Sequence, residues 1–124
     1  MMVTAATDYI AGSRSATRRK EERRAVVGKA VVQVVESANP SLVGTTFKSE
    51  IMDVSRSGMR LVCQEFIEDS RLDIWLAIEG INDKLFVSAE VRWASWDQHG
   101  DYELGVEIRD DAATDSRSWF LLWE

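Results

Sequence analysis

The chain has 124 residues, of which 45% are hydrophobic, and a formal net charge of −6. These values fit one globular domain with its own apolar core. The single cysteine, Cys63, excludes an intrachain disulfide and a multi-cysteine metal site, and no apolar run approaches the roughly 20 residues of a membrane span. Because the first residues lack the pattern of a secretory signal, we expect a cytoplasmic protein. We also expect Cys63 to be a small core residue, since it lies in an apolar-alternating run.

Charge is distributed unevenly along the chain. Residues 1–30 hold seven basic and three acidic side chains, a net charge of +4, so the rest of the chain carries −10. The basic segment is suited to attract phosphates, whereas the acidic remainder would repel a long nucleic acid.

The chain opens with small polar residues and then becomes rich in strand-forming ones. Residues 1–17 are typical of a flexible tail, and a charged hinge follows at residues 18–24. Six predicted strands come next, at residues 25–36, 45–54, 59–65, 71–79, 84–96 and 102–108. Their connections are too short for crossover helices, so we expect one domain at residues 18–124 that is a six-stranded antiparallel β-barrel.

Apolar alternation predicts which side chains face the core. In the fifth strand it places five residues on one face: Leu85, Val87, Ala89, Val91 and Trp93. Residues 110–124 are predicted to form a short helix that closes one end of the barrel, with Asp111 or Thr114 as its N-cap. The apolar face of this helix would consist of Trp119, Leu122 and Trp123.

Two polar clusters precede and follow the first predicted hairpin. Residues 18–23 form an R-R-x-x-x-R pattern, and residues 53–58 form a D-x-S-x-x-G pattern. Each alone is weak, since basic runs are usually solvated and Asp, Ser and Gly are common in turns. Their order is more specific, because V-R-W at residues 91–93 and Y-E-L-G-V-E-I at residues 102–108 follow downstream.

In this combination and order the chain resembles the PilZ domain family of bacterial cyclic di-GMP receptors, from about residue 18 to residue 108. The resemblance implies a ligand site for cyclic di-GMP and no catalytic cofactor. It implies that Arg19 and Arg23 bind guanine or phosphate, with Arg18 assisting. A guanidinium group matches the O6 and N7 acceptors of guanine bidentately.

The second cluster would complete this site. Asp53 is suited to the N1–H and N2–H₂ donors of guanine, because an ionised carboxylate only accepts hydrogen bonds. Ser55 would bind the base or order the turn, and Gly58 would allow a backbone conformation and a close approach that a side chain blocks. Trp93 is either an aromatic wall for a base or a core residue.

The N-terminal cluster also leaves a second register open. Glu21 and Glu22 lie between the arginines, and Lys20 with Arg24 has the same spacing as Arg19 with Arg23. We choose Arg19 and Arg23, because this register has arginine at both ends.

The sequence therefore predicts a receptor or adaptor for cyclic di-GMP. We expect its N-terminal arm to fold over the barrel when the ligand binds. This change would regulate an unidentified protein effector in motility, exopolysaccharide, biofilm or virulence. An enzyme is not expected, since the lone His99 lies in a predicted turn and no catalytic triad, zinc-ligand or phosphate-loop pattern is present. Two alternatives remain: a protein-interaction module without nucleotide binding, and a barrel that binds single-stranded nucleic acid.

Overall fold

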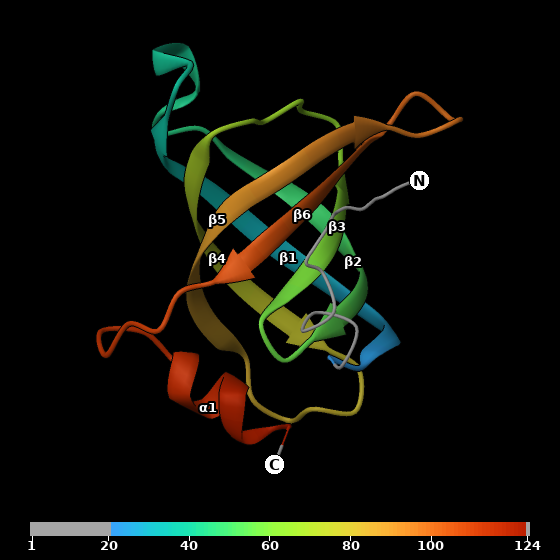
Figure 1. Ribbon diagram of the computed structural model, residues 1–124, viewed down its shortest axis with the longest axis vertical. Coiled ribbons are helices and arrows are strands. Elements are labelled where there is room, and N and C mark those ends of the chain that lie inside the picture. The colour runs from blue at the N-terminus through green and yellow to red at the C-terminus, as the bar shows by residue number, and fades with distance from the viewer. Residues whose placement is uncertain (1–20, 124) are drawn as a thin grey trace.

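The computed structural model describes residues 21–123 and shows a closed antiparallel barrel (Figure 1). Its strands are β1 (Arg23–Ser37), β2 (Thr46–Ser55), β3 (Gly58–Cys63), β4 (Ser70–Ile78), β5 (Leu85–Trp96) and β6 (Tyr102–Ile108). Around the barrel the order is β1-β2-β3-β6-β5-β4, with β4 paired back onto β1. A 3₁₀ helix, η2 (Pro40–Leu42), and a short helix, α1 (Ser116–Leu121), complete the fold. The predicted fold class is confirmed; the predicted tail at residues 1–17 lies outside the described residues.

Strict alternation builds the core of the barrel. In β4, every second residue is buried, from Leu72 at 0% exposure to Ile78 at 6%. Cys63 at the end of β3 is 3% exposed and packs in this core, as predicted. Because side chains of a strand point alternately to its two faces, the other residues of each strand form the outer surface of the barrel.

Four register shifts interrupt the strand pairing of the described residues. One lies between Val34 and Glu36, where β1 pairs with β4. The other three fall between Ala25 and Gly28 in β1, between Ile51 and Asp53 in β2, and between Val91 and Trp93 in β5. An extra residue in one strand turns the following side chain to the other face. Of the two roles left open for Trp93, the core position is therefore wrong: its side chain faces outward and is 45% exposed.

Helix α1 covers one end of the barrel (Figure 1). Trp119 is 1% exposed and belongs to the core, and its indole Nε1 donates a hydrogen bond of 2.9 Å to the Arg56 carbonyl in the β2–β3 turn. The sequence placed the helix start too early, since the N-cap position is Asp115. It also assigned Leu122 to the buried face, whereas Leu122 is 41% exposed.

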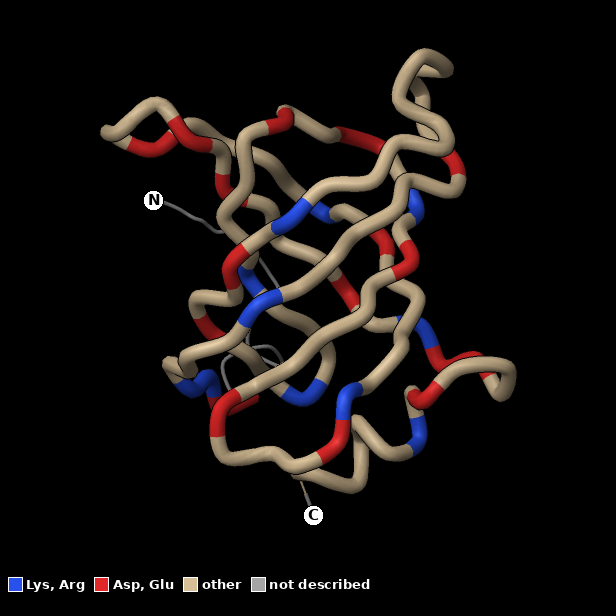
Figure 2. The backbone as a smooth tube through the Cα atoms, turned by 180° about the vertical axis from the view of Figure 1, so that it is seen from behind, with Lys and Arg blue, Asp and Glu red and all other residues tan. Residues whose placement is uncertain are grey.

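Basic and acidic residues lie near one another along the strands of the barrel (Figure 2). On β5, Glu90 accepts a hydrogen bond from Arg109 at 2.6 Å and forms an ion pair with Arg92 at 3.3 Å. On β4, Arg71 pairs with Glu36 of β1 at 3.2 Å. Among the described residues, no helix has the length and hydrophobicity needed to cross a membrane.

Candidate functional site

A row of side chains crosses the outer face of β2, β3, β6 and β5. Asp53 pairs with Arg60, Arg60 pairs with Gly105, and Gly105 pairs with Trp93 in the strand registers. The bulge before Asp53 directs this carboxylate outward while Val54 remains in the core at 4% exposure. The bulges in β2 and β5 therefore bring Asp53 and Trp93 onto the same surface.

Asp53 is the centre of an ion-pair network. Its Oδ1 accepts from Arg23 at 2.6 Å, and its Oδ2 lies 2.7 Å from Arg60. Arg60 also contacts Glu103 of β6 at 3.3 Å, and its Nε is buried without a hydrogen-bond partner among the described residues. The Asp53 side chain is 15% exposed, whereas that of Arg23 is 53% exposed. A largely buried carboxylate thus holds the more exposed Arg23 guanidinium, at the start of β1, against the barrel.

The β2–β3 turn lies beside this network and binds a carboxylate from the N-terminal segment. Ser57 donates to Glu21 Oε1 through its backbone N–H at 3.1 Å and through its hydroxyl at 2.6 Å. Partial burial tends to raise the pKa of Glu21, but hydrogen bonds from Ser57 and Ser55 and the charge of Arg23 outweigh it, so the pKa lies below its ordinary value. The turn is therefore able to hold an anionic group in place.

Two predicted site residues have structural duties in this turn. Ser55 is 1% exposed, which favours the turn-ordering role over direct contact with a base. At Gly58, a Cβ atom would lie 2.2 Å from the Val106 carbonyl oxygen, so β3 approaches β6 too closely for any side chain. The glycine is needed for this approach and not for an unusual φ.

The exposed indole of Trp93 covers the backbone of β6. A Cβ on Gly105 would lie 2.1 Å from Trp93 Nε1, which means that the ring rests directly on the glycine. The ring is thereby held in one orientation with part of its surface open to solvent. Such a surface suits the stacking of a planar base.

The structure separates the two possible registers of the arginine pair. Arg23 contacts Asp53, whereas Arg24 lies 4.7 Å from the centre of the Trp123 ring near α1 and pairs with Glu22 at 3.2 Å. Neighbouring residues of a strand point to opposite sides, so only one of them reaches the carboxylate. The predicted residues Arg18 and Arg19, and the alternative Lys20, lie outside the described residues.

Sequence reasoning undervalued three residues of this site. Arg60 and Gly105 are not among the site residues predicted from the sequence, and Glu21 is named there only as one of two acidic residues between the arginines. A lone glycine inside a strand indicates close approach of another group, and this signal could have identified Gly105. The contacts of Arg60 and Glu21 depend on strand register and are not visible in local sequence.

The arrangement combines an acceptor, guanidinium donors, an anion-binding turn and an aromatic surface. It can bind a ligand that is both planar and anionic, because each part of such a ligand has a matching group. Within residues 21–123, no cluster of three or more His, Cys, Asp or Glu side chains is placed to hold a metal ion.

The sequence model of the PilZ domain matches residues 17–120. The chain therefore belongs to the PilZ domain family. Comparison with curated protein sequences gives no match.

Three solved structures share the fold. They are the inhibitor of motility MotI/DgrA of Bacillus subtilis (17% identity, TM-score 0.60, covering 85% of this chain and 48% of that one), the PilZ domain of YcgR from Escherichia coli with c-di-GMP (12%, 0.56, 82% and 86%), and the MrkH–c-di-GMP complex of K. pneumoniae (11%, 0.56, 86% and 51%). At these identities the likeness shows the fold alone. The chain spans about half the length of MotI and of MrkH.

Proposed function

We propose that this chain is a receptor for cyclic di-GMP that binds the dinucleotide on the outer face of β2, β3, β6 and β5. The observation that carries the proposal is the contact of Arg23 with Asp53 at 2.6 Å, which joins the two sequence clusters into one site. Family membership supports it, as do the cyclic di-GMP complexes of YcgR and MrkH.

Guanine would replace the internal partners of this network. Its N1–H and N2–H₂ donors match the Asp53 carboxylate, which accepts from Arg23 and forms an ion pair with Arg60. Arg23, once released, offers two donors to guanine O6 and N7, and a good bidentate pair contributes about 1–3 kcal/mol of discrimination. The groups that bind the ligand are thus already paired with each other, so binding breaks these ion pairs, and the hydrogen bonds to guanine must offset that cost.

Trp93 and the β2–β3 turn would hold the remaining parts of the ligand. The indole offers a face on which a base can stack, worth about 1–3 kcal/mol. The Ser57 amide and hydroxyl both donate to Glu21, so a phosphate would compete with this carboxylate for them. Arg18 and Arg19 remain predicted ligand residues on the family pattern.

Titration calorimetry with cyclic di-GMP tests the proposal. Arg23→Ala and Asp53→Asn are each expected to weaken binding about ten- to 100-fold, since each removes a group that recognises guanine. Two matched controls make the same charge changes at ion pairs elsewhere: Arg71→Ala and Glu90→Gln. Failure of the wild-type protein to bind at micromolar concentration would refute the proposal, as would equal losses in variants and controls.

The output of the receptor is proposed to be regulation of a protein effector in the cytoplasm, with no catalysis by this chain. A barrel that binds single-stranded nucleic acid is disfavoured, because the described residues carry eleven basic against nineteen acidic side chains. If the barrel were instead an interaction module without a nucleotide, Arg23→Ala would leave effector regulation unchanged. A regulation assay with this variant separates the two.

A further inference from the structure

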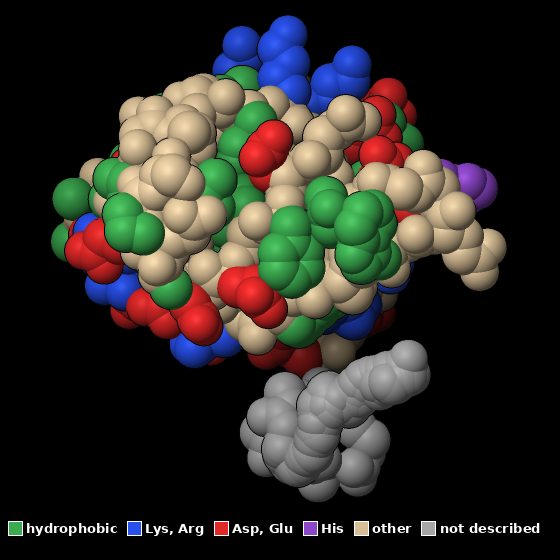
Figure 3. Space-filling model, turned by 90° about the horizontal axis from the view of Figure 1, so that it is seen from above, with side chains coloured by type: hydrophobic (Ala, Val, Ile, Leu, Met, Phe, Trp, Pro, Cys, Tyr) green, Lys and Arg blue, Asp and Glu red, His purple; other side chains and the backbone are tan. Residues whose placement is uncertain are grey.

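The end of the barrel opposite α1, at the top of Figure 1, carries an aromatic cluster formed by Phe66, Trp96 and Tyr102. The Tyr102 ring centroid lies 4.2 Å from that of Trp96 and 5.3 Å from that of Phe66. Trp96 is 64% exposed and Phe66 is 40% exposed, although the next residue, Ile67, is buried in the core. Figure 3 looks onto this end, where apolar side chains gather beside acidic ones. Exposed apolar side chains that cluster in this way mark a partner-binding surface more often than scattered ones do.

The aromatic cluster is separate from the candidate nucleotide site. Tyr102 pairs with Trp96 in the register of β6 and β5, whereas Gly105 pairs with Trp93. The two pairs are three positions apart on both strands, which corresponds to about 10 Å and turns the side chains to opposite faces. Tyr102 accordingly packs against the core, whereas Trp93 faces outward in the row of Asp53. The two surfaces therefore face different directions.

The loops around the aromatic cluster carry charge of one sign. Three connections between strands lie at this end: residues 38–45, 64–69 and 97–101. They contain no Lys or Arg and five acidic residues: Glu65, Glu68, Asp69, Asp97 and Asp101. None of these five forms an ion pair among residues 21–123. The connections at the α1 end carry both signs, with Glu79 and Lys84 in one of them.

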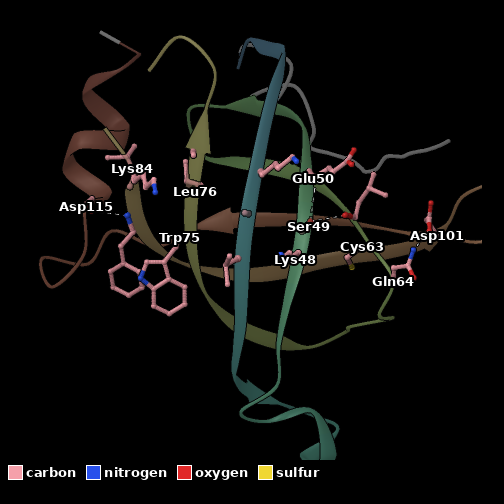
Figure 4. A pocket seen from close by; sticks show the side chains of 17 residues that line it. Lys48, Ser49, Glu50, Cys63, Gln64, Trp75, Leu76, Lys84, Asp101 and Asp115 are labelled. Atoms are coloured by element: carbon pink, nitrogen blue, oxygen red, sulfur yellow. Dashed lines mark hydrogen bonds between the residues drawn. The ribbon is translucent and has the colours of Figure 1, made fainter. Parts of the chain in front are cut away.

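Two of these carboxylates are held in place by hydrogen bonds beside the rings. Asp97 Oδ1 accepts from the backbone N–H groups of His99 and Asp101 at 2.7 Å and 3.0 Å. Asp101 accepts from the Gln64 side-chain amide at 3.2 Å, and Figure 4 shows these two side chains together. This bond joins the β5–β6 hairpin to the β3–β4 connection, so the aromatic and acidic groups belong to one surface.

Basic residues near this end do not cancel its charge. Arg71, at the start of β4, pairs with Glu36 at 3.2 Å. Lys48 lines the same hollow as Asp101, and Figure 4 shows both. When these three residues are counted with the five acidic ones of the connections, six acidic side chains face two basic ones, a net charge of −4. A partner for this surface is therefore positively charged.

We propose that the aromatic cluster and its surrounding carboxylates bind an arginine-containing segment of a protein partner. A guanidinium group stacks on the face of an indole and forks onto carboxylates, which suits the exposed Trp96 ring beside Asp97. Arginine and tryptophan are also the side chains that contribute most to protein interfaces. The inference does not rest on nucleotide binding.

Other occupants fit this surface less well. A second copy docked through the same end would bring two sets of carboxylates together, and their like charges repel. An anionic membrane or a nucleic acid is repelled for the same reason. This chain's own basic arm begins at the other end of the barrel, where Glu21 contacts Ser57 of the β2–β3 turn.

Calorimetry with a designed peptide tests this proposal, and because the titration contains no nucleotide, its outcome is independent of the proposed function. The probe is a short peptide in which several Arg alternate with Leu and Ser. Two control peptides replace every Arg by Lys, or every Arg by Gln. We expect the arginine peptide to bind the full chain, the lysine peptide to bind about three- to tenfold more weakly, and the glutamine peptide not to bind.

A tryptophan variant locates the aromatic part of the surface. Trp96→Ala is expected to weaken binding of the arginine peptide about three- to 20-fold, because it removes the face on which a guanidinium group stacks. The control is Trp75→Ala, which removes an indole that is 44% exposed on β4, and it should leave the affinity unchanged.

Charge variants locate the acidic part and do not alter any core residue. The double variant Glu65→Gln and Glu68→Gln is expected to weaken the peptide about two- to fivefold. Its control, Glu79→Gln with Asp83→Asn, removes the same charge from exposed residues of the β4–β5 connection and should leave the affinity unchanged.

Four results would overturn the proposal. One is no binding of the arginine peptide by the wild type at about 1 mM, and another is an equal loss in the variants and their controls. A Trp96-dependent dimer in sedimentation would make a second copy the occupant. The fourth is tighter peptide binding after all basic residues before Glu21 are changed to Gln, since this chain's own arm would then cover the surface; these are Arg14, Arg18, Arg19 and Lys20.

Discussion

The contact between Glu21 and the β2–β3 turn can be removed by Glu21→Ala. The carboxylate accepts two hydrogen bonds from Ser57, at 3.1 Å and 2.6 Å. Bonds to a charged acceptor contribute about 1.5–3 kcal/mol when buried, and partial exposure of this pair reduces the total to about 1–2 kcal/mol. The Ser57 amide should therefore exchange about five- to 30-fold faster with solvent in the variant.

NMR-detected hydrogen exchange measures this change, and Glu22→Ala is the matched control. Glu22 is the neighbouring carboxylate, but its one ion pair among the described residues is with exposed Arg24 at 3.2 Å. Because the folded pKa of Glu21 lies below its ordinary value, the contact is complete above the usual glutamate range near about 4.3 and is lost as pH falls through the lowered pKa. The difference between wild type and Glu21→Ala should vanish there. Equal exchange of Ser57 in both variants at neutral pH would refute this reasoning. If Glu21 also competes with the ligand, Glu21→Ala binds cyclic di-GMP more tightly than Glu22→Ala.

Two further predictions concern the barrel itself. Gly58→Ala should lower the free energy of unfolding by about 1–3 kcal/mol in thermal or urea melts, because its Cβ would meet the Val106 carbonyl at 2.2 Å. The control is Gly100→Ala, whose Cβ would have no atom within 4 Å and whose φ is positive at 87°, and it should lower the free energy of unfolding by less. The reverse order would contradict the close packing of β3 on β6. Burial raises the pKa of the Cys63 thiol; the hydrogen bond with the Glu65 backbone opposes this, and the charges of Glu65 and Asp101 add to it. Iodoacetamide should therefore label Cys63 slowly at pH 8 in the native protein and rapidly in urea, and fast native labelling would mean that this end of the barrel opens.

The barrel could be predicted from sequence because the relevant signal is local. Each strand carries its own alternation, as Leu72 to Ile78 in β4 shows, and short polar turns allow only antiparallel neighbours. Trp93 was misplaced because alternation assumes an unbroken strand, whereas the bulge after Val91 arises from pairing with β6. That pairing brings Gly105 under the indole, and no window of β5 alone contains this information.

The candidate site was predictable in its sequence clusters but not in its contacts. The order of the two motifs placed Arg23 and Asp53 in one hypothesis, and the structure brings these two side chains together. Arg60 was undervalued because an arginine on a polar strand face is usually solvated. Only the register of β2, β3 and β6 shows that it lies between Asp53 and Glu103.

The bond from the Trp119 indole to the Arg56 carbonyl has a mechanical consequence. The next residue, Ser57, holds Glu21, so two adjacent peptide units are fastened to opposite ends of the described chain. A displacement of the β2–β3 turn by a fraction of an ångström would act on α1 directly, because the Trp119 side chain that holds the turn is packed in the core. A ligand that moves the β2–β3 turn would thus shift the carboxyl-terminal helix while all six strands stay hydrogen-bonded.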